Sequence, residues 1–389
     1  MAVRIASGIS SADAGVDSFA EAAARAALGL GGLPADIAIV FAAAPNLAHA
    51  DLGVEIVSER LGSPAAIAGC GAQGVLAGGR ELETGGVAVW AASMPGADVE
   101  TFHLDAVPAG EGQVAVAGMP ELEDAEATIL IADPYTFPVE PLLTMLGDQL
   151  PGLPVVGGLA SGGGAPGDAV LIHGGDIARR GAVGVKLAGV DVHACVSQGA
   201  RPVGPEMVIT ACEGNKIHEL ASRPALRRLQ EAITDLDPLE RALAGRGLLL
   251  GIVIDENQPE YDRGDYLIRP ILGFDEREAS VVVGEQIRAG QTVRLQVRDG
   301  DSADDDLRHV LHDELGQLGG PPAGALVFTC NGRGSHMFPA PDHDASAVDQ
   351  AFAGAPAAGF FCAGEIGPVG DRNFVHGFTA TLAVFPGGD

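Results

Sequence analysis

The sequence predicts an α/β protein of layered mixed sheets flanked by helices, built from internally repeated strand-helix-strand-strand units in two halves. Three observations lead to this fold class. An order of buried strand, helix, proline-led strand, glycine-rich turn and strand recurs three times along the chain. Hydrophobic residues make up 47% of the 389 residues but aromatic residues only 4%, so Ala, Val, Leu and Ile must form the interior. A region of alternating polar and apolar residues, typical of half-exposed strands, separates the second copy from the third.

The first copy begins with a helix over residues 16–28, for which Ser18 is the expected N-cap. A buried strand, "DIAIVFAAA", follows, and then a helix, "AHADLGVEIVSERLG", that Gly62 ends. The segment "SPAAIAGCGAQG" is a short strand that breaks into a glycine-rich turn, and "GGVAVWAAS" is the last strand of this copy.

The second copy has the strand "ATILIAD", the helix "PVEPLLTMLGDQLPG", the strand and turn "LPVVGGLASGGG", and two strands in "GAVGVKLAGVDVHACVSQG". The third has the strand "GALVFTC", the helix "DASAVDQAFAG" with Asp344 as its expected N-cap, and the strand and turn "APAAGFFCAGEIGP". A long strand, 373–385, ends the chain. Gene duplication explains this recurrence most simply.

The copies align on the prolines that lead their second strands: Pro64, Pro154 and Pro356. This alignment ends the first strands at Phe41, Asp133 and Cys330. It also places Cys362 opposite Cys70.

The region between the second and third copies is predicted as a hairpin in "PEMVITACEGNKIHELA", a helix in "PALRRLQEAITDL" and strands in "GLLLGIVIDE" and "YLIRPILGFD". A second hairpin is expected in "ASVVVGEQIRAGQTVRLQVRDGD". The acidic run "DGDSADDDLRHVLHDEL" then begins a helix. Its aspartates lack the spacing to a glycine and to a terminal glutamate that a calcium loop requires, so we expect them to be solvated.

Charge and cysteine usage exclude several classes of function. The formal net charge is −29, and no run of Lys or Arg offers a stripe that neutralises phosphates, so neither nucleic acid nor an anionic membrane is an expected partner. No stretch reaches the roughly 18 apolar residues of a spanning helix, and no signal sequence begins the chain, which predicts a cytoplasmic protein. The five cysteines form no CxxC pair, so we expect reduced thiols.

Two glycine-rich turns, 157–164 and 362–370, fall at the same point of the repeat and are candidates for a ligand site. Glycines such as Gly158, Gly162 and Gly364 would let backbone N–H groups approach a ligand closely, with Ser161 beside them. Neither turn is a phosphate-binding fingerprint. The alternative is a pair of tight connections between strands.

Glu365 favours a site, because a carboxylate inside the apolar run "GFFCAGEIGP" must be hydrogen-bonded, paired or bound to a ligand. Arg333, in the turn "CNGRG", is the expected partner of Glu365. A guanidinium also holds a ligand carboxylate in a bidentate manner. On these residues alone, a purely structural Arg–Glu pair and a ligand contact are equally good interpretations.

Cys330 and His376 are the candidates for chemistry. Arg333 beside Cys330 would lower the thiol pKa, whereas Cys70 and Cys362 are expected to be apolar filling. Strand alternation places His376 on the core side, either as a neutral buried side chain or as a site residue. The sequence contains no HExxH or HxH motif for a metal and no GxSxG motif for a serine hydrolase.

With "GGLASGGG", "ITACEGNKIHEL", "CNGRGSHMF", "AGEIGP" and "VHGFTATLAVF" in this order, the chain resembles the FIST proteins, with an N-terminal half over 1–222 and a C-terminal half over 223–389. The resemblance implies an intracellular sensory module that binds small ligands, amino acids among them. Some relatives bind haem and sense nitric oxide. The positions that match are Cys330, Gly332, Arg333 and Gly334, then Gly364, Glu365 and Gly367, and finally His376.

The leading hypothesis is a non-catalytic small-ligand-binding protein in which Arg333 holds an anionic group and Glu365 a cationic or hydroxyl group. No kinase, methyl-accepting or cyclase segment is expected in the chain, so any signal would pass to a separate protein. The alternatives are an enzyme that uses Cys330 as nucleophile with His376 or Glu365 as general base, and a haem-binding gas sensor. Strands such as 373–385 offer an edge for a homo-oligomer.

Overall fold

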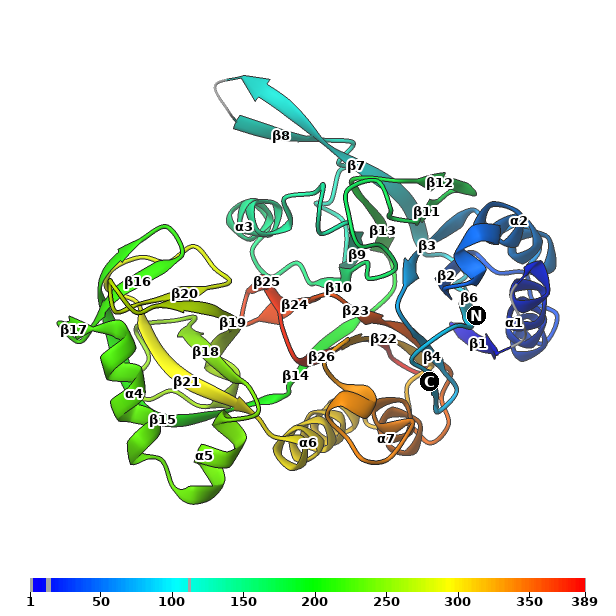
Figure 1. The fold of residues 1–389 in the computed structure, drawn as a ribbon. Helices are drawn as coiled ribbons and strands as arrows, with labels where there is room; N and C mark the ends of the chain where they lie inside the picture. Colours follow the sequence, from blue (N-terminus) through cyan, green and yellow to red (C-terminus); the bar gives the residue numbers. More distant parts are fainter. Residues whose placement is uncertain (1–2, 12–14, 111–112, 389) are drawn as a thin grey trace. The chain divides into compact units, whose positions relative to one another are not determined.

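The computed structural model describes residues 3–11, 15–110 and 113–388, and the chain forms two compact units (Figure 1). The larger unit comprises residues 1–196, 307–375 and 380–389, and the smaller unit residues 197–306 and 376–379. The predicted class, mixed sheets flanked by helices, is confirmed. Among the described residues, every helix is too short or too polar to span a bilayer.

Three sheets of the larger unit share one strand order, which confirms the threefold repeat. The first contains β1 (Arg4–Ser10), β6 (Val87–Ser93), β2 (Ile37–Ala43) and β3 (Ala66–Ala72). The second contains β7 (Asp98–Gly110), β13 (Ala182–Ala188), β9 (Ala127–Ala132) and β10 (Val155–Leu159), with β8 (Gln113–Ala117) beyond β7. The third contains β14 (His193–Gln198), β26 (Thr379–Phe385), β22 (Gly324–Cys330) and β23 (Ala357–Cys362). In each sheet the last two of these strands are parallel.

Each sheet is extended by two short strands that come from another copy. Strands β11 (Leu171–His173) and β12 (Asp176–Ala178) of the second copy extend the first sheet. Strands β24 (Glu365–Val369) and β25 (Arg372–His376) of the third copy extend the second sheet. Strands β4 (Val75–Ala77) and β5 (Arg80–Leu82) of the first copy extend the third sheet. The three copies therefore exchange hairpins in a cycle.

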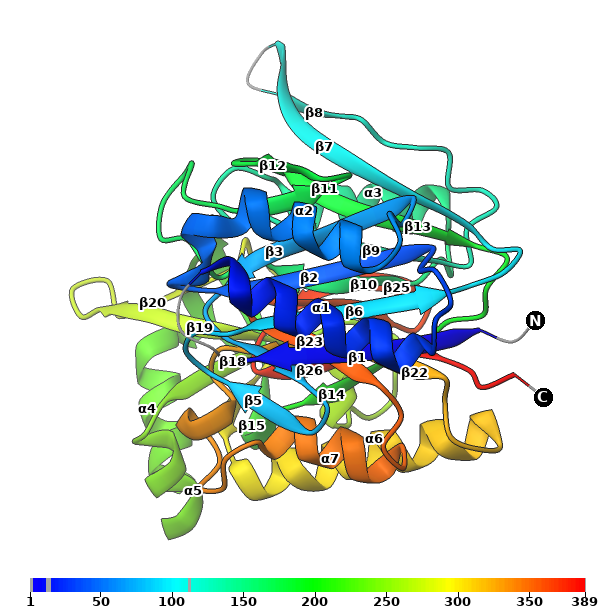
Figure 2. The same ribbon diagram turned by 90° about the vertical axis from the view of Figure 1, so that its right-hand side faces the viewer.

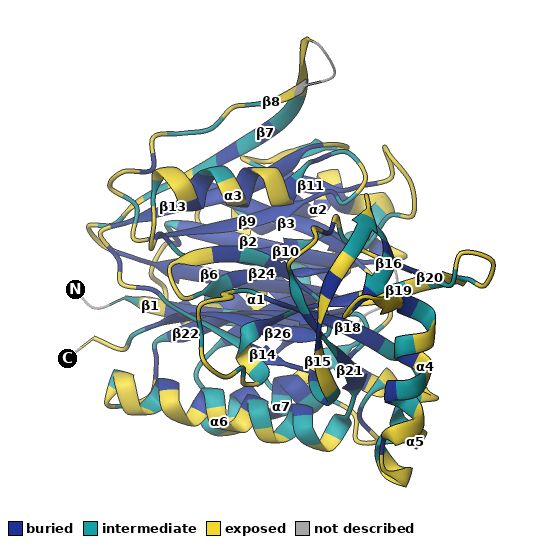
Figure 3. Cartoon of the chain, turned by 90° about the vertical axis from the view of Figure 1, so that its left-hand side faces the viewer, coloured by how far each residue is buried: buried dark blue, intermediate teal, exposed yellow. Residues whose placement is uncertain are grey.

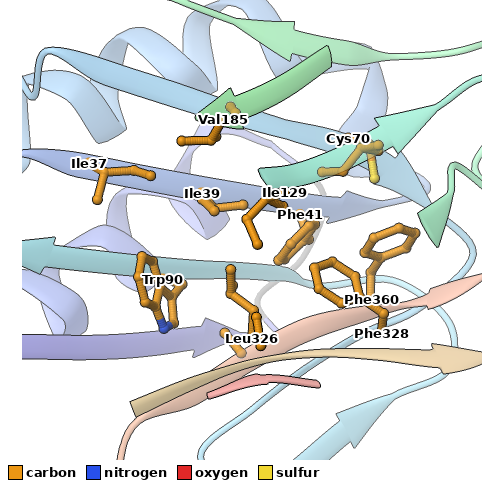
Figure 4. Close-up of a cluster of buried hydrophobic side chains, with 14 of the residues drawn as sticks. Ile37, Ile39, Phe41, Cys70, Trp90, Ile129, Val185, Leu326, Phe328 and Phe360 are labelled. Atoms are coloured by element: carbon orange, nitrogen blue, oxygen red, sulfur yellow. The ribbon is translucent and has the colours of Figure 1, made fainter. Parts of the chain in front are cut away.

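The inner faces of the three sheets share one hydrophobic core (Figure 4). Phe41, Phe328 and Phe360 meet there, with the ring centroids of Phe41 and Phe360 5.0 Å apart. Helices α1 (Val16–Leu30) and α2 (Ala50–Arg60) cover the outer face of the first sheet, α3 (Val139–Gln149) that of the second, and α6 (Gly300–Leu318) with α7 (His343–Ala351) that of the third. These strands are buried on both faces, which explains their continuous apolar sequences (Figure 3).

Three equivalent glycines fix the true alignment of the copies. In the parallel pairs, Gly69, Gly157 and Gly359 stand opposite Val40, Leu130 and Val327, respectively. An added Cβ at each glycine would lie 1.9, 1.9 or 1.6 Å from the carbonyl oxygen of that partner. Each copy therefore needs glycine at this position, where the strands approach too closely for any side chain.

This register corrects the alignment on prolines, which is two residues out of step in the first copy. Cys362 is equivalent to Ala72, not to Cys70, because both follow their glycine by the same number of residues. By the same count, Cys330 is equivalent to Ala43 rather than to Phe41.

The smaller unit contains a sheet that closes on itself. Its order is β15 (Ala200–Glu213), β21 (Thr292–Arg298), β18 (Leu248–Val253), β19 (Tyr266–Asp275), β20 (Ser280–Val283), β16 (Lys216–Leu220) and β17 (Arg223–Pro224), and β15 also pairs with β16. The helices α4 (Ala225–Asp235) and α5 (Pro238–Ala244) belong to this unit. The predicted β15–β16 hairpin is confirmed. The predicted hairpin of β20 with β21 is wrong, because β20 pairs with β19 and β16 whereas β21 pairs with β15 and β18.

Three local predictions also differ from the structure. Gly15 is the N-cap residue of α1, and Ser18 is buried inside its first turn. Asp342 precedes α7, so Asp344 lies within the helix and its carboxylate is used elsewhere. The long strand 373–385 is broken into β25 and β26 by Gly377 and Phe378, and β26 is an interior strand between β14 and β22.

Candidate functional site

The three glycine-rich turns meet at one end of the central core of the larger unit. Gly162 N donates a hydrogen bond of 3.1 Å to Gly71 O, so the turn after β10 contacts the end of β3. Leu159 N donates to Gly364 O (2.7 Å), which joins the last residue of β10 to the turn after β23. Ser161 Oγ accepts from Gln73 N and donates to Phe361 O, and so bridges all three copies. The turns 157–164 and 362–367 therefore converge.

The glycines of these turns serve packing between strands. A Cβ added to Gly158 would lie 2.4 Å from Cys362 Sγ, and one added to Gly162 would lie 2.6 Å from the carbonyl carbon of Gly71. A Cβ at Gly364 would lie 3.0 Å from Leu159 Cδ1. The space beside these three residues is therefore filled by protein atoms.

We expect Gly158→Ala to lower the free energy of unfolding by about 1–3 kcal/mol, because the new methyl group must displace the buried Cys362 side chain. Gly164→Ala is the matched control from the same turn, since an added Cβ there meets no atom within 4 Å. Urea denaturation of both variants measures the difference. Equal stability of the two variants would contradict the close packing of these turns.

The turn "CNGRG" joins the same end of the core. Asn331 N donates to Cys362 O (2.9 Å), and Cys330 stands opposite Cys362 in the parallel pair of β22 and β23. Gly332 N lies 3.4 Å from Cys330 Sγ, and Gly334 has φ of 57°, which favours glycine. The motif is thus held in place by the backbone of the strand that precedes Glu365.

Arg333 is completely buried and forms a bidentate ion pair with Asp344. Its Nε donates to Asp344 Oδ2 (2.7 Å) and its Nη2 to Asp344 Oδ1 (2.9 Å). Burial alone would raise the pKa of Asp344, but the Arg333 charge and hydrogen bonds from His343, Arg333 and Thr329 outweigh it and hold that pKa well below its usual range. Asp344 is therefore an ionised partner that fixes the guanidinium in one orientation.

One nitrogen of the Arg333 guanidinium, Nη1, is not used in the ion pair with Asp344. The guanidinium carbon lies 5.1 Å from the centroid of the Phe338 ring, and the His343 ring stacks on Phe338 at 3.4 Å. Nη1 of Arg333 is buried and has no hydrogen-bond partner within the described part of the chain. Oδ1 of Asn331, two residues away, is likewise buried without such a partner among described residues. A buried donor and a buried acceptor thus lie in one turn.

Glu365 is buried at the start of β24, opposite Gly158 of β10. Burial lowers the pKa of Arg333. The charge and hydrogen bond of Asp344 and the charges of Cys330 and Glu365 outweigh this effect, so the pKa of Arg333 lies above its usual value. Glu365 and Arg333 thus interact electrostatically, while the bidentate carboxylate partner of Arg333 is Asp344. Burial, and then the Glu365 charge, raise the pKa of the Cys362 thiol well above its usual value.

Comparison with known families identifies the chain. The FIST N domain matches residues 36–223, and the FIST C domain matches residues 225–368. The chain belongs to the FIST family. FIST domains are associated with sensory and signalling roles.

Two mycobacterial proteins are similar to this chain over nearly its full length. An uncharacterized protein of Mycobacterium tuberculosis (strain CDC 1551 / Oshkosh) is 44% identical over 387 residues, which cover 98% of this chain and 100% of the relative. An uncharacterized protein of Mycobacterium bovis (strain ATCC BAA-935 / AF2122/97) is 41% identical over 386 residues, which cover 98% and 99%.

The converging turns join the two FIST domains. Gly158, Ser161 and Gly162 belong to the FIST N domain, whereas Arg333 and Glu365 belong to the FIST C domain. All five lie in the larger unit. His376, which the sequence pattern groups with them, is buried in the smaller unit.

Two glutamates near the "CNGRG" turn are not expected from the sequence. Glu81 lies in β5 of the exchanged hairpin β4–β5, and Glu83 directly follows β5. Glu81 Oε1 accepts from Ala345 N (2.9 Å), and Glu83 accepts from the backbone N–H (2.7 Å) and the hydroxyl group of Ser335. Burial, and then the charge of Asp344, raise the pKa of Glu81 to about 7. No local signal in "GRELETGG" reveals a neighbour that lies more than 200 residues away.

Proposed function

We propose that this FIST protein binds a small zwitterionic metabolite, an amino acid or a close analogue, and acts as a sensory protein in the cytoplasm. The observation that carries the proposal is the buried donor and acceptor of the "CNGRG" turn, Arg333 Nη1 and Asn331 Oδ1. Buried polar groups without partners are rare in folded proteins, and those that occur often bind a ligand, an ion or a water molecule. An amino acid supplies both complements, a carboxylate for the guanidinium and an ammonium group for the amide oxygen.

The charges around the turn favour the same class of ligand. Asp344 neutralises Arg333, and Glu365 adds a further buried acidic group that acts on the same guanidinium. A purely anionic ligand would therefore meet a region without excess positive charge. A zwitterion adds no net charge to the interior, so its burial costs less than that of an anion.

Thermal unfolding in the presence of each of the common amino acids tests the proposal. A ligand at about 100 times its Kd stabilises the protein by about 2.7 kcal/mol, which a shift in Tm detects. Arg333→Lys retains the charge but removes Nη1, and Asn331→Ala removes the acceptor. We expect both variants to lose the shift.

Arg269→Lys is the matched control, because Arg269 is also buried and also bonded to a carboxylate, that of Glu285 at 2.8 Å. It should keep the shift of the unaltered protein. The proposal is wrong if no amino acid raises Tm, or if both Arg333→Lys and Asn331→Ala respond like Arg269→Lys.

A further inference from the structure

A two-stranded ribbon extends from the second sheet of the larger unit. Residues 98–104 of β7 pair with β13, whereas residues 105–110 pair with β8 alone. Figures 1 and 2 show the outer part of β7 and its partner β8 projecting away from the three sheets. A ribbon of two strands is marginally stable in water by itself, so a surface that covers this one would stabilise it.

One face of the ribbon carries apolar side chains both where it packs against the unit and farther out, where it is exposed to solvent. Ala106 and Val116 form a cross-strand pair and pack against the core beneath α3. The next pair on that face is Pro108 and Val114, and the Val114 side chain is 57% exposed. Val107, on the opposite face, is 38% exposed. Both faces thus present apolar side chains to solvent.

The outer edge of β8 is also open. β8 is the last strand of its sheet, so its outward N–H and C=O groups have no neighbouring strand within the described part of the chain. Natural edge strands are usually protected by charges or proline, but the sequence "QVAVA" of β8 contains neither. An unprotected edge of this kind is a template for pairing with another strand.

We propose that this ribbon is the dimerisation arm of the protein and that its partner is the ribbon of a second copy. Two β8 strands related by a twofold axis would pair antiparallel and bring their apolar faces together. This arrangement needs no complementary sequence, because both partners present the same edge.

Charge favours a second copy at this place. The chain has a net charge of −29, so contact between two bodies is opposed by repulsion. Residues 106–110 and 113–117, by contrast, include no charged residue, and Glu111 is the one charged residue between them in the sequence. The five residues of β8 span about 17 Å, which exceeds the Debye length of about 8 Å at physiological ionic strength. Ribbon pairing therefore joins two acidic chains through uncharged segments and holds the bodies apart.

Sedimentation velocity of the full chain and of Val114→Asp tests the proposal. The substitution places two carboxylates near each other across the twofold axis, and we expect it to raise the dimer dissociation constant more than about tenfold. Leu52→Asp on α2 is the matched control, because Leu52 is also 57% exposed. It should leave the dimer unchanged.

Hydrogen exchange of the β8 amides gives a second readout that does not depend on a variant. In the dimer, these amides should exchange more slowly at high protein concentration than at low concentration. A chain that is monomeric at all soluble concentrations overturns the proposal. So does a Val114→Asp variant that dimerises as tightly as Leu52→Asp, or exchange in β8 that does not depend on concentration.

Discussion

Asp344→Ala is expected to lower the free energy of unfolding by about 3–5 kcal/mol, because it leaves the Arg333 guanidinium charged and completely buried. The variant also removes the acceptor of Thr329 Oγ1. Urea or thermal denaturation measures the loss. The large size follows from the burial of the pair, since a buried charge without its partner is much less stable than the same charge in water.

Asp148→Ala is the control for this prediction, because Asp148 pairs with Arg372 on the surface and an exposed ion pair contributes only about 0–1 kcal/mol. The double variant Arg333→Met, Asp344→Leu removes both charges and should be more stable than Asp344→Ala alone. Equal losses in Asp344→Ala and Asp148→Ala would show that Arg333 is not held as the structure indicates.

Glu81→Gln is expected to make the protein less sensitive to pH. The pKa of Glu81 is raised from 4.5 to about 7, so the folded state favours the protonated carboxyl group. Its contribution to stability is present below the unfolded pKa and is lost as pH rises through about 7. Between about pH 5 and pH 8, the unaltered protein should lose about 2–3 kcal/mol more stability than Glu81→Gln.

Glu231→Gln provides the control, because the pKa of Glu231 is lowered by its hydrogen bond to Arg228 and its titration falls below this pH range. Denaturation at both pH values should therefore give the unaltered pH dependence for Glu231→Gln. If Glu81→Gln loses as much stability with pH as Glu231→Gln does, the Glu81 carboxyl group does not titrate near neutral pH.

The repeated order of elements can be predicted from sequence, because each strand and helix of a copy is defined by local patterns. The strands β2, β9 and β22 read as continuous apolar runs, and the glycine turns mark their neighbours. Pairing between distant segments has no such local signal. The cyclic exchange of hairpins therefore cannot be predicted. The alignment on Pro64 is out of register because matching prolines compares positions in the sequence and not the hydrogen-bonded pairing of the strands.

The candidate site can be predicted only in part, for the same reason. The convergence of the turns follows from the repeat, since equivalent strands end at one edge of the core. The capping rule misassigns Asp344, because an aspartate near a helix start satisfies that rule, and this hides its role as the partner of Arg333. Glu81 lies in an exchanged hairpin and Glu83 directly follows it. Their contacts with Ala345 and Ser335 join segments far apart in the sequence, so only the three-dimensional structure reveals them.

A crystal structure of the protein grown with the amino acid that gives the largest Tm shift would show whether the "CNGRG" turn holds the ligand. We expect a ligand carboxylate oxygen about 2.7–3.2 Å from Nη1 of Arg333, with Asp344 still bonded to Nε and Nη2. A ligand bound elsewhere, with Nη1 bonded to a protein carbonyl group, would contradict the proposed site.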